Sequence, residues 1–169
     1  MKTLCTTLLL IAFNLALTAQ SESDVVNNIK YISEVVSENE SSEIQKIQDV
    51  VAYYNIENAD VFDANEKSTY DVVFTKTNCK IEVTYNSEGE ILKSTEVYSD
   101  MRLPVSLVKL ILKEHSTWYI SDNVQKIYYS SKSGTHKVYE LKIKKESKVE
   151  NLKFKIDIED TSMAYVAIN

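Results

Sequence analysis

The sequence predicts an α+β protein: an antiparallel β-sheet built from two tandem helix-plus-four-strand units, with helices on one face and the other face exposed to solvent. Three observations support this class. Apolar residues recur at helical spacing in three segments, and apolar and charged residues alternate in several others. The order of helix and strands also occurs twice along the chain. One charged side on each strand is typical of a sheet that helices cover on one face only.

The composition favours a protein that folds and binds over one that catalyses. The chain has 169 residues, and 44% of them are hydrophobic, which is enough to build a core. With only 2 glycines and 1 proline, phosphate-binding loops and nucleotide fingerprints are not expected. The 2 histidines and 2 cysteines leave little material for a zinc site or a Cys/His catalytic centre. We therefore expect no catalytic residues, no metal and no cofactor.

Residues 1–19 have the pattern of a cleaved secretory signal peptide. Lys2 supplies the positive charge, Leu8 to Leu17 form an apolar run too short to span a membrane, and Ala19 is a small residue at the cleavage position. We expect cleavage near Ala19, a secreted or periplasmic location, and no stable membrane insertion.

Cleavage leaves Cys79 as the lone thiol of the exported chain, because Cys5 is removed with the signal peptide. Cys79 can be a small apolar residue buried in the core, or it can form a disulfide bond with a second chain. We favour burial and a monomer. The exported fold must then be held together by core packing alone.

Residues 20–41 form an N-terminal helical segment, and a second helix opens the first repeat, residues 42–100. The first helix is predicted over residues 23–38 and the second over 43–55, where Ser42 and Gln45 resemble a capping box. The expected core-facing positions are Val25, Ile29, Ile32 and Val36 in the first helix, and Ile44, Ile47, Val50, Val51 and Tyr54 in the second.

From residue 59 the apolar residues recur with a period of two, which predicts a short strand and then three longer ones in the first repeat. Residues 70–74 and 80–85 alternate in polarity around a tight hairpin, and residues 91–98 continue as a third strand. A turn over residues 86–89 joins the last two strands, where Gly89 is free to adopt a positive φ angle. Neighbouring strands in the sequence are therefore expected to pair.

The second repeat, residues 101–169, begins with a third helix that should end near His115. Pro104 is favoured at the first helical position, because its missing N–H has no partner there. When the two repeats are aligned with an offset of 69 residues, Tyr70 of the first corresponds to Tyr139 of the second. The expected apolar face of the helix comprises Val105, Val108, Ile111 and Leu112, and the expected strands cover residues 124–130, 139–144, 152–158 and 163–168.

Four motifs of the chain are shared with a known family: Leu103-Pro104, Trp118, the strand from Tyr70 to Phe74, and the turn from Asn86 to Glu90 followed by Ile91-Leu92. With these motifs the chain resembles the PepSY-like, β-lactamase-inhibitor-protein-like family of small exported proteins, found mostly in Bacteroidetes-type bacteria. The likeness covers residues 42–168, and the second copy departs from the pattern because residues 157–160 lack the glycine that Gly89 supplies in the first. The resemblance implies a non-enzymatic, inhibitor-like module that binds a protein through its exposed sheet.

Charge is distributed unevenly along the chain. Residues 20–100 carry 6 basic and 17 acidic side chains, a net charge of −11, whereas residues 101–169 carry 12 basic and 8 acidic ones, a net charge of +4. Such a molecule can orient a charged partner during approach. Nucleic acid is not expected as that partner, because the chain is exported and acidic overall. Lysines supply the positive end: Lys142, Lys144, Lys145, Lys148, Lys153 and Lys155.

These observations make an unknown protein the expected partner, bound by the exposed sheet face. In Tyr128-Tyr129 one ring must face the core and the other the solvent, where it can anchor a partner. The lysines have an alternative role, since charge on a sheet also keeps it soluble and prevents unwanted strand pairing. The candidate partner-binding residues are Tyr128, Lys142, Lys144, Lys153 and Lys155.

Two other functions remain open. The first is a periplasmic binder of a small ligand or metal ion, with a pocket between helices and sheet. Its support is the carboxylates Glu88 and Glu90 and the group Asp157, Glu159 and Asp160, which are also typical of solvated strand ends. The second is an enzyme of unfamiliar type that uses Glu88, Asp157 or His136.

Overall fold

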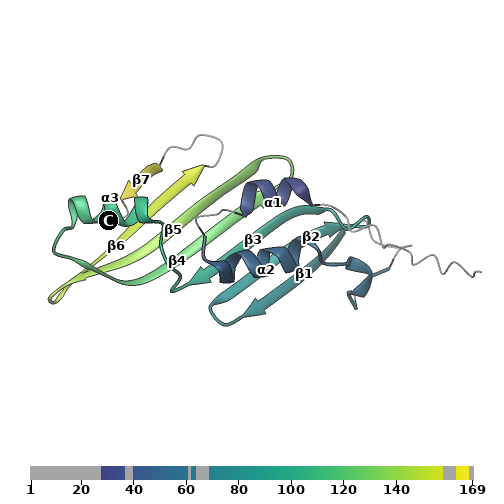
Figure 1. Ribbon diagram of the computed structural model, residues 1–169, viewed down its shortest axis with the longest axis horizontal. Coiled ribbons are helices and arrows are strands. Elements are labelled where there is room, and N and C mark those ends of the chain that lie inside the picture. Colours follow the sequence, from purple (N-terminus) through teal and green to yellow (C-terminus); the bar gives the residue numbers. More distant parts are fainter. Residues whose placement is uncertain (1–27, 37–39, 61, 64–68, 158–162, 168–169) are drawn as a thin grey trace, which may run out of the picture.

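The structure is a computed structural model, and it describes residues 28–36, 40–60, 62–63, 69–157 and 163–167. In this part of the chain, seven strands form one antiparallel sheet and three α-helices pack against one of its faces (Figure 1). The α+β class and the one-sided layering are confirmed. The predicted signal peptide lies outside the described residues. No helix of the described part is long and apolar enough to cross a membrane.

The elements follow the order that the hydrophobic periodicity predicts. The helices are α1 (Ile29–Val35), α2 (Ser42–Ala52), the short 3₁₀ helix η1 (Ile56–Asn58) and α3 (Val105–Glu114). The strands are β1 (Thr69–Lys76), β2 (Cys79–Asn86), β3 (Ile91–Ser99), β4 (Tyr119–Ser130), β5 (Gly134–Lys145), β6 (Lys148–Asp157) and β7 (Met163–Ala167).

The sheet is a meander in which each strand pairs with its neighbours in the sequence. Its order is β1-β2-β3-β4-β5-β6-β7, as the short connections predict. The pairing of β3 with β4, which places Val97 opposite Lys126, joins the two predicted repeats in one continuous sheet. Gly89 adopts a φ angle of 79° in the predicted turn between β2 and β3, which confirms the role expected for this glycine.

The two predicted units are not confirmed as equal copies. Three described strands follow α2, whereas four follow α3. In the position of a first strand after α2, residues 53–60 and 62–63 contain η1 and no strand. The fold is therefore an α+β meander with helices inserted before β1 and before β4.

Two apolar clusters lie between the helices and the sheet. The larger one lies beneath α1 and α2 and includes Ile44, Val51 and Tyr85. The smaller one joins Leu107 and Ile111 of α3 to β5 and β6. Cys79 belongs to the larger cluster and is free and buried, so the buried role is confirmed. Burial raises the pKa of this thiol to about 11.

The buried faces of α1 and α2 are rotated from the predicted ones. Ile29 is 60% exposed and Val50 is 56% exposed, whereas Tyr31 and Gln48 are fully buried. The predicted stripes do not include Tyr31 or Gln48, which carry polar groups. Tyr31 and Gln48 are buried because their polar groups bind a carboxylate inside the protein, Glu96. Val25 lies outside the described residues.

The buried face of α3 is also rotated from the predicted one, because Leu107 and Leu110 pack on the smaller cluster. Val105 is 59% exposed and Leu112 is 45% exposed, whereas Leu107 and Ile111, one turn apart, are buried. Pro104 is the N-cap and not the first helical residue, and it leaves this cap without a side-chain hydrogen bond. Similarly, the N-cap of α2 is Ser41, one residue before the predicted Ser42, and its hydroxyl accepts from the Ile44 amide.

Candidate functional site

The surface of β4, β5 and β6 opposite the helices carries the candidate site, and we call it the open face. Its side chains alternate with core residues such as Ile127, Tyr139 and Leu152, as the period of a strand requires. The described side chains of the open face are Asp122, Val124, Lys126 and Tyr128 on β4, His136, Val138, Glu140, Lys142 and Lys144 on β5, and Val149, Asn151, Lys153 and Lys155 on β6.

All five candidate residues from the sequence lie on the open face. Lys142 and Lys144 project from β5, whereas Lys153 and Lys155 project from β6. Tyr128 projects from the middle of β4. The placement follows from alternation alone, because their neighbours in each strand belong to the core. Their role in binding stays a prediction.

Tyr128 forms an aromatic pair with His136. The two residues lie opposite each other on β4 and β5, and their rings stack with centroids 4.8 Å apart and an interplanar angle of 19°. The adjacent Tyr129 is 4% exposed and packs edge-to-face on Tyr31. The tyrosine pair therefore divides between solvent and core as predicted, and Tyr128 presents a flat ring on the open face.

Glu140 is held at the centre of the open face by two lysines. Its carboxylate accepts a hydrogen bond of 2.7 Å from Lys126 Nζ and lies 3.2 Å from Lys153 Nζ. The hydrogen bond from Lys126 lowers the pKa of Glu140 below its ordinary value and raises the pKa of Lys126. The three side chains come from three strands, so only the pairing register reveals the group.

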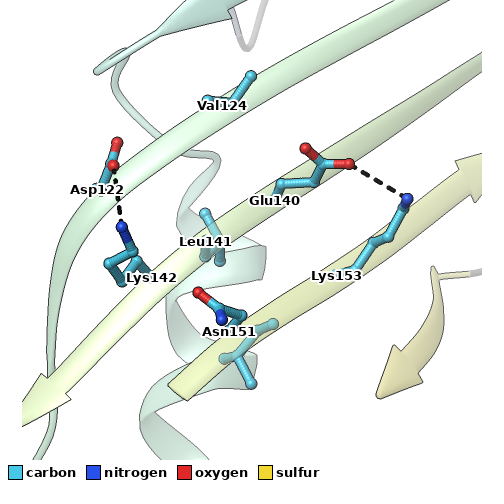
Figure 2. Close-up of a pocket in the computed structure, with 8 residues that line it drawn as sticks. Asp122, Val124, Glu140, Leu141, Lys142, Asn151 and Lys153 are labelled. Atoms are coloured by element: carbon cyan, nitrogen blue, oxygen red, sulfur yellow. Dashed lines mark ion pairs between the residues drawn. The ribbon is translucent and has the colours of Figure 1, made fainter. Parts of the chain in front are cut away.

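A hollow of about 260 Å³ lies between two ion pairs on this face (Figure 2). On one side Lys142 Nζ lies 3.9 Å from Asp122 Oδ2, and on the other side Lys153 contacts Glu140. Two of the five predicted residues therefore line the hollow. Its lining comprises Asp122, Val124, Glu140, Leu141, Lys142, Asn151, Leu152 and Lys153.

Of the carboxylates that supported the small-ligand hypothesis, that of Glu90 has a local structural partner. In the turn after β2, the Asn86 side chain accepts hydrogen bonds from the backbone amides of Glu88 and Glu90 and donates one to the Glu90 carboxylate. Glu159 and Asp160 lie outside the described residues, as does the side chain of Asp157. In the described part of the chain, no group of three or more His, Cys, Asp or Glu residues is arranged to hold a metal ion.

The space between α2 and the sheet is much smaller than the hollow on the open face. A pocket of about 20 Å³ lies there, lined by residues that include Glu43, Cys79 and Tyr98. This volume has room for about one water molecule. The predicted ligand pocket between helices and sheet therefore has no room for an organic ligand at this position.

A fully buried carboxylate, Glu96, lies inside the larger core cluster. It accepts hydrogen bonds from the hydroxyls of Tyr31 and Tyr98, at 2.7 and 2.6 Å, from the Gln48 amide at 2.9 Å, and from the Ser94 hydroxyl at 3.2 Å. Burial raises the pKa of Glu96, although each of these donors opposes the rise. The sequence analysis missed this group.

A buried ion pair between Glu40 and Lys137 joins the segment before α2 to β5. Lys137 Nζ lies 2.9 Å from Glu40 Oε1, and the two side chains are 8% and 3% exposed. The same oxygen accepts from the Gln125 amide, and Lys137 also donates to the Val35 carbonyl at the end of α1. The pair fixes the segment before α2 on the sheet. Lys137 and Tyr139 are two residues apart on β5, so their side chains point to the same face of the sheet. This spacing from a core tyrosine is the sequence signal that places Lys137 on the core face.

Comparisons of the chain with protein-family models, with curated proteins and with solved structures find no match.

Proposed function

We propose that this protein is an exported, non-catalytic binding module that docks a protein partner through the open face. One observation carries the proposal: this face has no helical cover in the described structure, and all five candidate residues lie on it, two of them at a hollow. Lys142 and Lys153 line the hollow, and the Tyr128 ring lies on the same surface. A regular sheet surface with charged side chains and an exposed aromatic ring is suited to a protein surface.

The repeated plan supports the suggested likeness to the PepSY-like, β-lactamase-inhibitor-protein-like family. Tyr70 of β1 and Tyr139 of β5 correspond at the predicted offset, and both are buried beneath helices, at 1% and 2% exposure. Val83 and Leu152 correspond in the same way and are also buried. We propose that β1–β3 and β5–β7 are the matching parts of the two repeats, each buried against its own helix. An inhibitor-like role is part of this proposal.

The proposed export agrees with the chemistry of the described fold. Cys79 is buried in the larger core cluster, and a buried thiol of this kind is protected from oxidation outside the cell. We propose a secreted or periplasmic monomer, released by cleavage near Ala19.

Reversing the charge of four open-face lysines is expected to reduce capture of the partner at least about tenfold, since like charges across an interface cost several kcal/mol. The protein is immobilised and incubated with the secreted and periplasmic fractions of the native organism. Captured proteins are then quantified by mass spectrometry. The variant carries Lys142→Glu, Lys144→Glu, Lys153→Glu and Lys155→Glu.

A matched variant reverses four exposed charges on or beside the helices and must capture the same proteins as the natural chain. Thermal unfolding of both variants establishes that each is folded. Recovery of the same partners by the open-face variant contradicts the proposal. The control substitutions are Lys46→Glu, Arg102→Glu, Lys109→Glu and Lys113→Glu, all at exposed positions.

A further inference from the structure

We infer that the hollow on the open face seats acidic side chains from an extended segment of the protein partner. In this arrangement Lys142 and Lys153 exchange their own carboxylates, Asp122 and Glu140, for those of the partner. The inference rests on the proposed function, because it names the chemistry of the protein that the open face docks.

The ion pairs beside the hollow are easily exchanged. Lys142 Nζ lies 3.9 Å from Asp122 Oδ2, and the two side chains are 44% and 50% exposed. An exposed pair of this kind contributes little to stability, so little is lost when the lysine turns to another carboxylate. Lys153 lies 3.2 Å from Glu140, which Lys126 already binds at 2.7 Å. Two ammonium groups thus share one carboxylate.

The balance of charge on the open face selects an acidic occupant. Its described side chains include five lysines and two carboxylates, although the whole chain carries a net charge of −6. The surplus of positive charge is thus local to this surface. An entering carboxylate gains from that surplus, whereas a cationic side chain is repelled by it.

The spacing of the lysines matches an extended chain. Lys142 and Lys144 are two residues apart on β5, and Lys153 and Lys155 are two residues apart on β6. Side chains two residues apart on a strand are separated by about 6.6 Å and point the same way. A partner segment in extended conformation with Asp or Glu at every second position has the same repeat. Lys142 and Lys153 are the members of the two lysine pairs that line the hollow, and Figure 2 shows them on either side of it. One acidic side chain of the partner segment then enters the hollow between these two lysines.

The test uses a capped octapeptide of four Glu-Ser repeats as the probe, titrated into the isotope-labelled full chain at low salt. Backbone and lysine NMR signals report where it binds. The expected result is a saturable shift at Lys142, Asn151 and Lys153, with dissociation in the millimolar range, typical of a few charge contacts. Lys142→Gln with Lys153→Gln should weaken binding at least about fivefold. Lys109→Gln with Lys113→Gln on α3 should leave it unchanged.

Three outcomes overturn the inference. The first is the absence of NMR shifts on the open face at a peptide concentration of about 10 mM, which is ten times the highest expected dissociation constant. The second is an equal response to the peptide of four Gln-Ser repeats. The third is tighter binding of a single-stranded oligothymidylate at the same lysines, which assigns the surface to nucleic acid.

The inference and the proposed function fail in different ways. Suppose that the four-lysine variant no longer captures a protein, but the acidic peptide causes no NMR shifts on the open face. The proposed docking face is then supported, and the proposal of an acidic partner segment is wrong. If capture does not depend on the four lysines, the docking face itself is wrong.

Discussion

Replacing Lys137 by methionine is expected to lower the free energy of unfolding by about 3–5 kcal/mol, because it leaves the Glu40 carboxylate buried without its counter-charge. Lys137 and Glu40 are 8% and 3% exposed at their side chains and lie 2.9 Å apart. The substitution also removes the hydrogen bond to the Val35 carbonyl. Urea unfolding followed by circular dichroism measures the change. Lys132→Met, at an exposed position in the turn before β5, is the control and should change stability by less than about 0.5 kcal/mol.

A second substitution separates the charge from the packing. Glu40→Gln combined with Lys137→Met removes both charges and keeps an acceptor for the Gln125 amide, which bonds to Glu40 at 2.8 Å. Removing both charges of a buried pair is often close to neutral, so the double variant should recover at least about half of the lost stability. A double variant as unstable as Lys137→Met alone contradicts the electrostatic explanation and assigns the loss to packing.

Replacing Glu96 by leucine is expected to lower the free energy of unfolding by about 3–5 kcal/mol, because it leaves four buried hydrogen-bond donors without their acceptor. These donors belong to α1, α2 and β3 and include Tyr31, Gln48 and Tyr98. Glu96→Gln should cost less, because the Gln48 side-chain oxygen, which has no hydrogen-bond partner among the described residues, can accept from the new amide. Urea unfolding of both variants measures these changes. A leucine variant with unchanged stability contradicts the account.

The pH dependence of stability gives an independent test of Glu96. Its folded-state pKa is raised above the ordinary value of 4.5, mainly because the carboxylate is buried. The stability that this group contributes is therefore fully present below the unfolded-state pKa and is lost as the pH rises through the folded-state pKa. The stability of the natural chain relative to Glu96→Gln should increase as the pH falls from 8 toward about 4.5. A decrease over this range, as for a carboxylate with a lowered pKa, contradicts the assignment.

The alternation of side chains was sufficient to predict the open face. Within a strand, parity alone decides which residues face the solvent, so Lys142, Lys144, Lys153 and Lys155 could be placed without knowing any strand partner. The helical stripes were less informative. They mislocated the buried faces of α1 and α2 because Tyr31 and Gln48 are polar by type but are buried against Glu96.

The hollow could not be predicted from the sequence, because its residues meet only across strands. Asp122 faces Lys142 and Lys153 faces Glu140 in the register of β4 with β5 and of β5 with β6. The register of β4 also shifts between Ile120 and Asp122, an irregularity that no local pattern reveals. The ion pair of Glu40 and Lys137 was missed for the same reason, since 97 residues separate its members.

The buried polar groups explain how the helices are fixed and leave the open face as the candidate site. Glu96 has an exposed fraction of 0%, so no substrate in solution can reach it in this structure. Its donors, together with the pair of Glu40 and Lys137, hold α1 and α2 on one side of the sheet. Because the helices are held on that side, Lys142, Lys144, Lys153 and Lys155 have no helix over them on the other side of the sheet.

The most direct test of the docking face is a comparison of lysine acetylation in the free protein and in its complex with the captured partner. Mass spectrometry gives the rate at each lysine. The proposal predicts that Lys142, Lys144, Lys153 and Lys155 react at least about fivefold more slowly in the complex, because an interface excludes water and reagent from its centre. Lys109 and Lys113 of α3 should react at unchanged rates. Protection of the α3 lysines, with unchanged rates on β5 and β6, contradicts it.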